Sequence, residues 1–224
     1  MFNLLKRLKF LGIVLAILSV IIITIFYNLL KVDRTLPIYQ PASVNAELVD
    51  STIQHQKKYH RISDFSLINQ NGIHITQEDF KDKIYVADFF FTTCQTICPI
   101  MTKNMFEIQN TFIEDDDVMI LSHSVTPDID TVAQLKQYAQ EKGVNVSKWH
   151  LVTGDKKQIY ELARKSYLAV KEVGDGGPFD MIHTENFILI DKSQQIRGFY
   201  DGTEQKDINR LIEDIKTLKA SYKK

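Results

Sequence analysis

The sequence predicts an α/β domain in three layers that follows a single membrane-spanning helix. Two observations lead to this prediction. From about Arg61 onward, strand-length apolar runs alternate with segments of helical periodicity, the pattern of a central sheet covered by helices. Before that region, residues 10–30 are 21 consecutive residues without a charge, and about 20 apolar residues suffice for a helix to cross a bilayer.

The composition is that of a globular protein and excludes several classes. Of 224 residues, 44% are hydrophobic and 25% are charged, so the chain is not a disordered or fibrous protein. Two cysteines are too few for a disulfide-rich scaffold. The formal net charge is −1 and no basic stripe is present, which argues against nucleic acid as a partner.

Residues 1–30 are expected to form a membrane anchor. Lys6, Arg7 and Lys9 precede the uncharged run and fewer positive charges follow it closely, an asymmetry that favours a cytoplasmic N-terminus. A cleaved signal peptide is the alternative. The run is longer than the apolar region of a signal peptide, and no small-residue cleavage pattern follows it, so we expect a retained anchor.

Residues 31–60 have weak periodicity and are expected to be a juxtamembrane linker, which leaves 61–224 as the folded domain. The domain begins with a hairpin, since the turn-forming pair Asn71-Gly72 separates two short strands. A continuous apolar and aromatic run at 83–91, KIYVADFFF, is typical of a buried central strand. Apolar residues then recur at helical spacing between 101 and 112.

Helix caps define the second half of the domain. Asp130 is expected as the N-cap of a helix at 131–142, which ends at Gly143. Asp155 and Gln158 resemble a capping box at the start of a further helix. The remaining expected elements are strands at 117–125 and 149–153, a hairpin at 186–191 and 195–200, and a closing helix at 207–221. This order of elements is that of a thioredoxin-like fold, a central mixed sheet flanked by helices.

Cys94 and Cys98 stand where the buried strand ends and a helix begins. Backbone N–H groups and the helix dipole favour an anion there, and thiolate is both the reactive and the metal-binding form of cysteine. Pro99 suits the first helical turn. Three intervening residues place the sulfurs about one turn apart, close enough for a disulfide or for a shared soft metal ion. Two purely structural thiols are the remaining alternative.

His183 is the candidate third ligand. It lies just before the strand expected at 186–191, at the edge of the sheet where the fold brings a loop opposite the cysteine-bearing turn. Two thiolates and one imidazole make a trigonal set suited to monovalent copper. The other histidines have no metal-ligand spacing, and Met101 and Met105 have the spacing of a helix core face.

Three segments together resemble the Sco/SenC family of copper chaperones. They are FFFTTCQTICPIMTKNM around the cysteines, WHLVTG at 149–154 and HTENFILID at 183–191. The resemblance covers the chain from about Ile62 onward and includes the order of the segments. The resemblance implies a variant of the thioredoxin fold and a copper ion bound by Cys94, Cys98 and His183. It also implies that the protein handles copper for the dinuclear copper centre of cytochrome c oxidase.

The sequence departs from the family pattern in two places. Gln95 follows the first cysteine where the family usually has proline. In the family, the strand before the second helix usually ends in Asp-Pro. Here the corresponding residues are Thr126-Pro127, and Asp128 and His123 are the candidates to replace the missing acid.

The expected function is that of a membrane-anchored copper metallochaperone. Its expected partners are the copper-bearing subunit of cytochrome c oxidase or another copper or thiol carrier, and the membrane through residues 10–30. The expected location is a bacterial inner membrane, which the chain crosses once, with the domain on the periplasmic or outer side.

An enzymatic alternative uses the same dithiol, namely a thiol–disulfide oxidoreductase that reduces the cysteines of a partner protein. Reductases of this fold place a cis-proline ahead of a strand opposite the cysteines, and no proline directly precedes Asn186, which favours metal binding. A thiol peroxidase would explain neither Cys98 nor His183. A membrane-tethered scaffold would leave the cysteines incidental.

Overall fold

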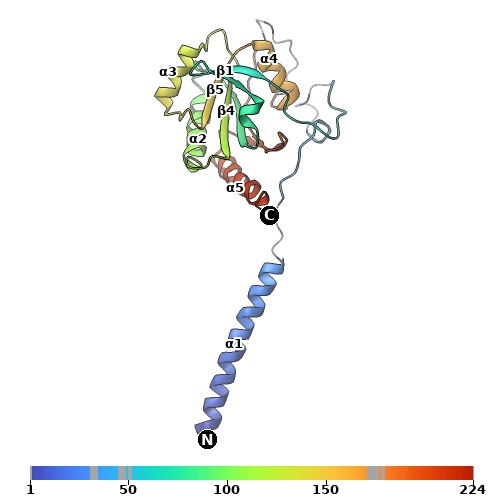
Figure 1. Cartoon of the computed structure of the whole chain (residues 1–224), viewed down its shortest axis with the longest axis vertical. Helices are drawn as coiled ribbons and strands as arrows, with labels where there is room; N and C mark the ends of the chain where they lie inside the picture. Colours follow the sequence, from blue (N-terminus) through green and yellow to red (C-terminus); the bar gives the residue numbers. More distant parts are fainter. Residues whose placement is uncertain are drawn as a thin grey trace. The chain divides into compact units, whose positions relative to one another are not determined.

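The chain divides between Thr35 and Leu36 into a helical unit and an α/β unit. The computed structural model describes residues 2–30, 35–44, 49, 52–170, 177 and 180–223 (Figure 1). In the first unit, α1 (Phe2–Leu30) contains a segment, Lys9–Phe26, with a mean hydropathy of 2.7. By length and composition this helix is able to cross a membrane.

The second unit is built on one mixed sheet of seven strands, ordered β2-β1-β5-β4-β3-β6-β7. The central strand β3 is parallel to β4 and antiparallel to β6. All seven residues of β3 are buried, which explains why its sequence is apolar and aromatic except at Asp88. The strands are β1 (Ser66–Asn69), β2 (His74–Thr76), β3 (Ile84–Phe90), β4 (Val118–Ser124), β5 (Trp149–Thr153), β6 (Asn186–Ile190) and β7 (Ile196–Asp201).

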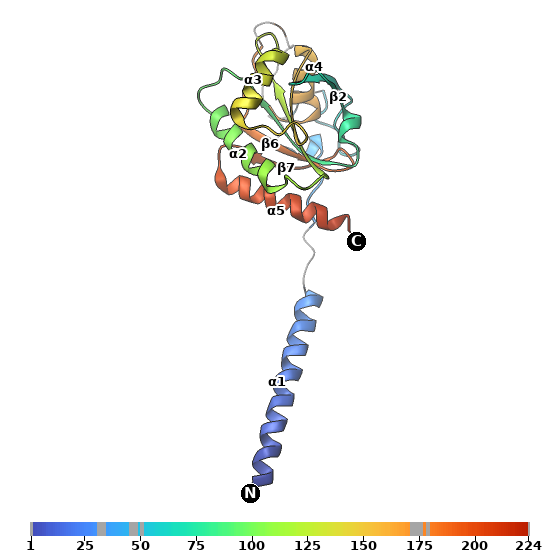
Figure 2. The same ribbon diagram turned by 60° about the vertical axis from the view of Figure 1, so that its left-hand side comes forward.

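Helices cover both faces of the sheet. Figures 1 and 2 show α2 (Cys98–Thr111), α3 (Val132–Lys142) and α5 (Gln205–Ser221) on one side of the strands, and α4 (Lys156–Glu161) on the other. Alternate residues of β3 point to opposite faces, so Val86 enters the core beneath α2 whereas Phe89 enters the core beneath α4. This arrangement confirms the predicted α/β, thioredoxin-like fold.

The start of α3 differs from the prediction. The N-cap is Thr131, whose hydroxyl accepts a hydrogen bond of 3.3 Å from Gln134 N–H, so the prediction of Asp130 is wrong. Asp130 is instead fully buried and accepts hydrogen bonds from Thr92, just after β3, and from Ser124, at the end of β4. The predicted stop is confirmed, because Gly143 ends α3 in the left-handed conformation at φ +71°.

The start of α4 follows the prediction. Asp155 caps the helix by accepting a hydrogen bond of 2.7 Å from Gln158 N–H. The α-helix ends at Glu161 and continues as a π-helical turn over Leu162–Ser166. Such turns are frequent at functional sites.

The described residues of 36–44, expected in the linker, pack on the α/β unit. Leu36 is 7% exposed within the core beneath α2. Tyr39 N–H donates to the carbonyl of Ile196 in β7 at 2.9 Å. Arg197 in β7 donates to the carbonyls of Leu36 and Pro37 at 2.6 and 2.9 Å. The compact α/β unit therefore includes residues from Leu36 onward.

Candidate metal centre

The turn between β3 and α2 places Cys94 at the surface of the unit. β3 ends at Phe90, and Cys94 N–H donates to the carbonyl of Phe91 at 3.3 Å, which closes a tight turn. The side chain of Cys94 is partly exposed, whereas Cys98 in the first turn of α2 is 3% exposed. Both are free thiols. The two sulfurs therefore meet different surroundings although they belong to one turn.

The N-terminus of α2 has no side-chain cap. The first helical N–H groups need acceptors, and Cys98 N–H donates to the sulfur of Cys94 at 3.5 Å. Thr96 Oγ1 lies 3.6 Å from the same sulfur. Cys94 thus takes the position of an anion at the end of a helix, where the dipole favours negative charge.

These surroundings separate the acidities of the two thiols. Burial alone would raise the pKa of Cys94, but hydrogen bonds from the Cys98 side chain and N–H and from Thr96 outweigh it and lower the pKa to about 7. Burial raises the pKa of Cys98 to about 12, and the neighbouring Cys94 adds to that rise. Cys94 is therefore the thiol that ionises near neutral pH, whereas Cys98 keeps its proton.

Alkylation of the reduced full chain in detergent with iodoacetamide should therefore modify Cys94 first. Only the thiolate reacts, so the rate should rise as pH increases and reach half its maximum near the Cys94 pKa of about 7. Cys98 should remain unmodified over that range, as mass spectrometry of the peptides would show. Thr96→Val should move the midpoint upward. Equal modification of both cysteines, with a common midpoint near pH 8.5, would contradict this asymmetry.

His183 stands across a small pocket from the two cysteines. Cys94, Cys98 and His183 all line this pocket, which has a volume of about 100 Å³. The imidazole of His183 is exposed and meets the ring of Phe91 edge-on, with centroids 6.1 Å apart. The remaining walls are mainly apolar and include Phe89, Phe91, Ile97, Val125 and Ile182.

The structure thus brings the three predicted ligands to one pocket, but not yet to bonding distance of a common ion. Within the described ranges, no three His, Cys, Asp or Glu side chains are grouped closely enough to hold a metal. Of these three side chains, His183 is exposed, Cys94 is partly exposed and Cys98 is buried. The donor set itself, two soft sulfurs and one nitrogen, fits copper.

Asp130 supports the cysteine-bearing turn, a role that was not predicted. Its carboxylate accepts hydrogen bonds from Thr92 N–H at 3.2 Å, Thr92 Oγ1 at 2.5 Å, Ser124 Oγ at 2.6 Å and Thr126 Oγ1 at 3.0 Å. Thr92 lies two residues before Cys94, and Ser124 ends the neighbouring strand β4. Asp130 therefore joins the two strand ends beside the pocket.

Asp88 is a second acidic residue that the sequence interpretation left unassigned. It lies within β3, is 4% exposed and accepts a short hydrogen bond from Ser122 Oγ. Ser122 in turn accepts from Trp149 Nε1 at 2.8 Å. Burial raises the pKa of Asp88 to about 7, although the bond from Ser122 opposes that rise. The sequence interpretation treated the strand as one apolar run and passed over this charged position.

The proposed substitutes for the family's missing acid do not line the pocket. Asp128 is exposed, on the loop between β4 and α3. His123 is fully buried behind Phe89, with the two rings stacked at 4.8 Å, and burial lowers its pKa to about 4. Met101 and Met105 are buried in the core beneath α2, as predicted.

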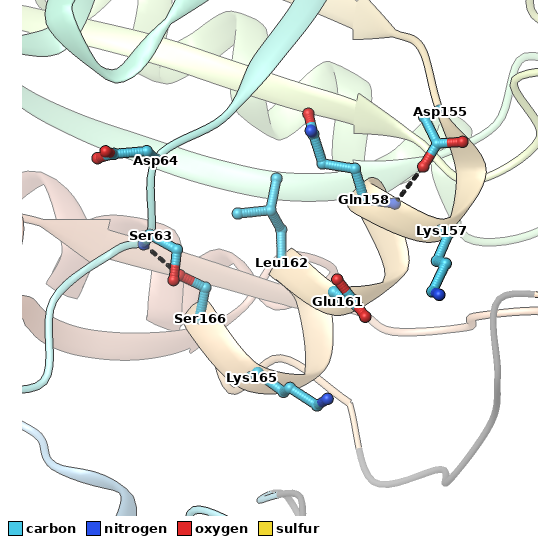
Figure 3. Close-up of a pocket in the computed structure, with 9 residues that line it drawn as sticks. All are labelled: Ser63, Asp64, Asp155, Lys157, Gln158, Glu161, Leu162, Lys165 and Ser166. Atoms are coloured by element: carbon cyan, nitrogen blue, oxygen red, sulfur yellow. Dashed lines mark hydrogen bonds between the residues drawn. The ribbon is translucent and has the colours of Figure 1, made fainter.

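A larger pocket, with a volume of about 490 Å³, lies elsewhere, beside α4 (Figure 3). Its walls are polar and charged, and they include Asp64, Asp155, Lys157, Glu161 and Lys165. Some lining residues are hydrogen-bonded to each other; for example, Ser63 N–H donates to Ser166 Oγ at 2.6 Å. This pocket contains no sulfur or histidine, so soft-metal chemistry belongs to the smaller pocket.

Comparison with known proteins identifies relatives of most of the chain. The family model described as SCO1/SenC matches residues 53–220. The SCO1 protein homolog of Bacillus subtilis (strain 168) is 33% identical over 160 residues, which cover 70% of this chain and 82% of that protein.

Solved structures agree with these sequence matches. BsSco, a member of the Sco family of cytochrome c oxidase assembly proteins in which a disulfide switch was identified, matches with a TM-score of 0.61. It is 32% identical, over 71% of this chain and 93% of its own. Arabidopsis thaliana ScoI with copper bound matches with a TM-score of 0.56 and 26% identity, over 70% of this chain and 98% of its own.

Proposed function

Because the chain belongs to the SCO1/SenC family, we propose that it is a copper metallochaperone that carries one copper ion between Cys94, Cys98 and His183. The observation that carries this proposal is the shared pocket of these three side chains. Thiolate and imidazole are the side chains that copper prefers, in both of its common oxidation states. The apolar walls limit access of water to the ion.

The division of roles follows from the two sulfurs. Cys94 is partly exposed and ionises near neutral pH, so it is the first ligand to meet an arriving ion. Cys98 is buried and must lose its proton on binding, since thiolate is the ligand. His183 closes the site from the opposite wall and, being exposed, is the ligand that an acceptor protein displaces first.

The proposed acceptor follows from the relatives. BsSco belongs to a family of cytochrome c oxidase assembly proteins, and Arabidopsis ScoI binds copper. We therefore infer that this chain delivers copper to the copper-bearing subunit of such an oxidase, or to another copper or thiol carrier. In this proposal α1 anchors the protein in the cytoplasmic membrane, with the α/β unit on the periplasmic or outer side.

A second candidate function is thiol–disulfide exchange, favoured by the separated acidities of Cys94 and Cys98. In this reaction the Cys94 thiolate attacks a disulfide of the partner, forms a mixed disulfide and releases one partner thiolate. Cys98 then loses its proton and attacks the Cys94 sulfur. The partner leaves with both cysteines reduced, and the two electrons come from the dithiol, which becomes a Cys94–Cys98 disulfide.

His183→Ala separates the two functions. Copper(II) prefers imidazole in addition to sulfur, whereas two thiolates alone hold copper(I) in a linear arrangement. In the reduced full chain in detergent, copper(II) affinity should fall by more than about 100-fold, because loss of a ligand exceeds the effect of losing a residue that orients one. Copper(I) affinity should change far less. Competition with chelators of known affinity and sulfur-to-copper charge-transfer absorption measure both.

His74→Ala is the matched control, because His74 is an exposed histidine on β2, outside the pocket. It should leave both affinities unchanged. If His183→Ala also leaves copper(II) binding and its spectrum unchanged, the three-ligand site is wrong. Thiol–disulfide exchange then becomes the leading function.

A further inference from the structure

A buried ion pair holds the segment that precedes His183. Arg164, in the π-helical turn after α4, donates to both carboxylate oxygens of Asp180, at 2.7 and 2.6 Å. The two side chains are 6% and 9% exposed. Asp180 lies three residues before His183. The pair therefore joins the α4 side of the unit to the segment that leads into the pocket.

Tyr160 strengthens the same connection. Its hydroxyl lies 3.1 Å from the carbonyl of Asp180 and 2.9 Å from the carbonyl of Val125, a residue of the pocket wall. The guanidinium of Arg164 lies 5.4 Å from the centroid of the Tyr160 ring. One aromatic side chain thus contacts the ion pair, the segment before His183 and Val125, the residue that follows β4.

The segment after His183 is fixed as well. Thr184 Oγ1 and Asn186 Nδ2 donate to the carbonyl of Ala169 at 2.8 and 3.1 Å. Ile182 is 2% exposed in the core beneath α4. The exposed imidazole of His183 therefore stands on a backbone that is held on both sides, and rotation about its side-chain bonds remains the free motion.

We propose that Arg164 and Asp180 are positioning residues for His183, which hold its backbone so that the imidazole reaches an ion between Cys94 and Cys98. This inference rests on the proposed copper site. A buried ion pair is by itself a weak source of stability, because desolvation offsets the attraction. The planar fork of arginine, however, fixes a carboxylate in two directions, which suits a pair that must set a geometry.

The pair acts on one ligand and not on the others. Cys94 lies in the turn between β3 and α2, and Cys98 begins α2. Asp130 supports this turn through its bonds to Thr92 and Ser124. In the part of the chain that the structure describes, neither Arg164 nor Asp180 forms a hydrogen bond with a cysteine side chain. Loosening the ion pair should therefore weaken the contribution of His183 and leave the dithiol intact. Because copper(II) depends on imidazole more than copper(I) does, the effect should depend on oxidation state.

The test is Arg164→Lys, which keeps the charge but loses the bidentate fork. In the full chain in detergent, copper(II) affinity should fall by about tenfold, within the range seen when a residue that orients a metal ligand is replaced. Copper(I) affinity should stay within about twofold of the original, because the two thiolates remain in place. The charge-transfer band of copper(II) should shift or broaden.

Arg197→Lys is the matched control, because it makes the same change in another arginine–aspartate pair. Arg197 donates to Asp191 at 2.8 Å, with side chains 14% and 3% exposed, and lies on β7 away from the pocket walls. This variant should leave copper(II) affinity unchanged. An equal loss in the two variants would show a general effect of destabilisation and overturn the proposal, as would an Arg164→Lys chain with unchanged copper(II) binding.

A double substitution establishes that Arg164 acts through His183. In a His183→Ala background, Arg164→Lys should have no further effect on copper(II) affinity, since the group that it positions is absent. A further tenfold loss in that background would overturn the positioning role while leaving the copper site itself in place. A His183→Ala chain with undiminished copper(II) binding would overturn the site and the positioning role together.

Discussion

Replacing either Cys94 or Cys98 with serine should abolish tight binding of copper in both oxidation states. A serine hydroxyl is a poor soft ligand and stays protonated near neutral pH, so a single thiolate and one imidazole remain. The expected loss of copper(I) affinity exceeds about 100-fold, more than the loss of a residue that only orients a ligand. Anaerobic competition with a copper(I) chelator, on the full chain in detergent, measures it.

Met105→Leu provides the control for this experiment. It removes a sulfur atom from the same helix, α2, but from a side chain that is fully buried in the core. Methionine and leucine have similar volumes, so the fold should tolerate the change at a cost below about 1.5 kcal/mol. Copper affinity should remain unchanged. Tight copper(I) binding by either serine variant would show that the two sulfurs do not act as a pair.

Asp130→Ala should destabilise the α/β unit by about 3 kcal/mol, because buried donors lose their acceptor when the carboxylate is removed. Thr92 N–H, Thr92 Oγ1, Ser124 Oγ and Thr126 Oγ1 all donate to this carboxylate, which is fully buried. Trp149 is the single tryptophan and is 2% exposed, so its fluorescence reports unfolding in urea. The urea midpoint should fall, with an unchanged slope.

Asp128→Ala is the matched control, since Asp128 is an exposed carboxylate two residues away in the same loop. A surface change of this kind should alter the free energy of unfolding by less than about 0.5 kcal/mol. Similar urea midpoints for the two variants would show that the bonds to Asp130 contribute little. The turn that carries Cys94 would then owe its shape to the chain around it and not to this carboxylate.

Local patterns in the sequence were sufficient to predict most elements. The apolar run of β3 and the helical spacing of Met101 and Met105 reflect burial, which periodicity records directly. The cysteine pair was also predictable, because it follows β3 immediately and precedes Pro99 at the start of α2. His183 needed the resemblance to a known family, since a single histidine carries no spacing signal.

The residues that support the site were not predictable in the same way. Asp130 and Thr131 are neighbours, and both residue types cap helices well. Only the donors that the fold brings from Thr92 and Ser124 decide that Asp130 faces inward and Thr131 caps the helix. The pairing of Arg164 with Asp180 likewise joins residues 16 positions apart in the sequence, and no periodic pattern records such a contact.

The packing of residues 36–39 on β7 has a consequence for the solubility of the α/β unit. β7 is an outer strand of the sheet, and outer strands present free N–H and C=O groups that can pair with a second copy of the chain. The N–H group of Tyr39 donates a hydrogen bond to the carbonyl of Ile196. The rings of Tyr39 and Phe199 pack edge-on, with centroids 5.3 Å apart. A fragment beginning at Arg61 would lack residues 36–39 and would expose the backbone edge of β7 to pairing with another chain. Residues 36–39 thus cover part of the outer edge of β7 and hinder edge-to-edge pairing with a second copy.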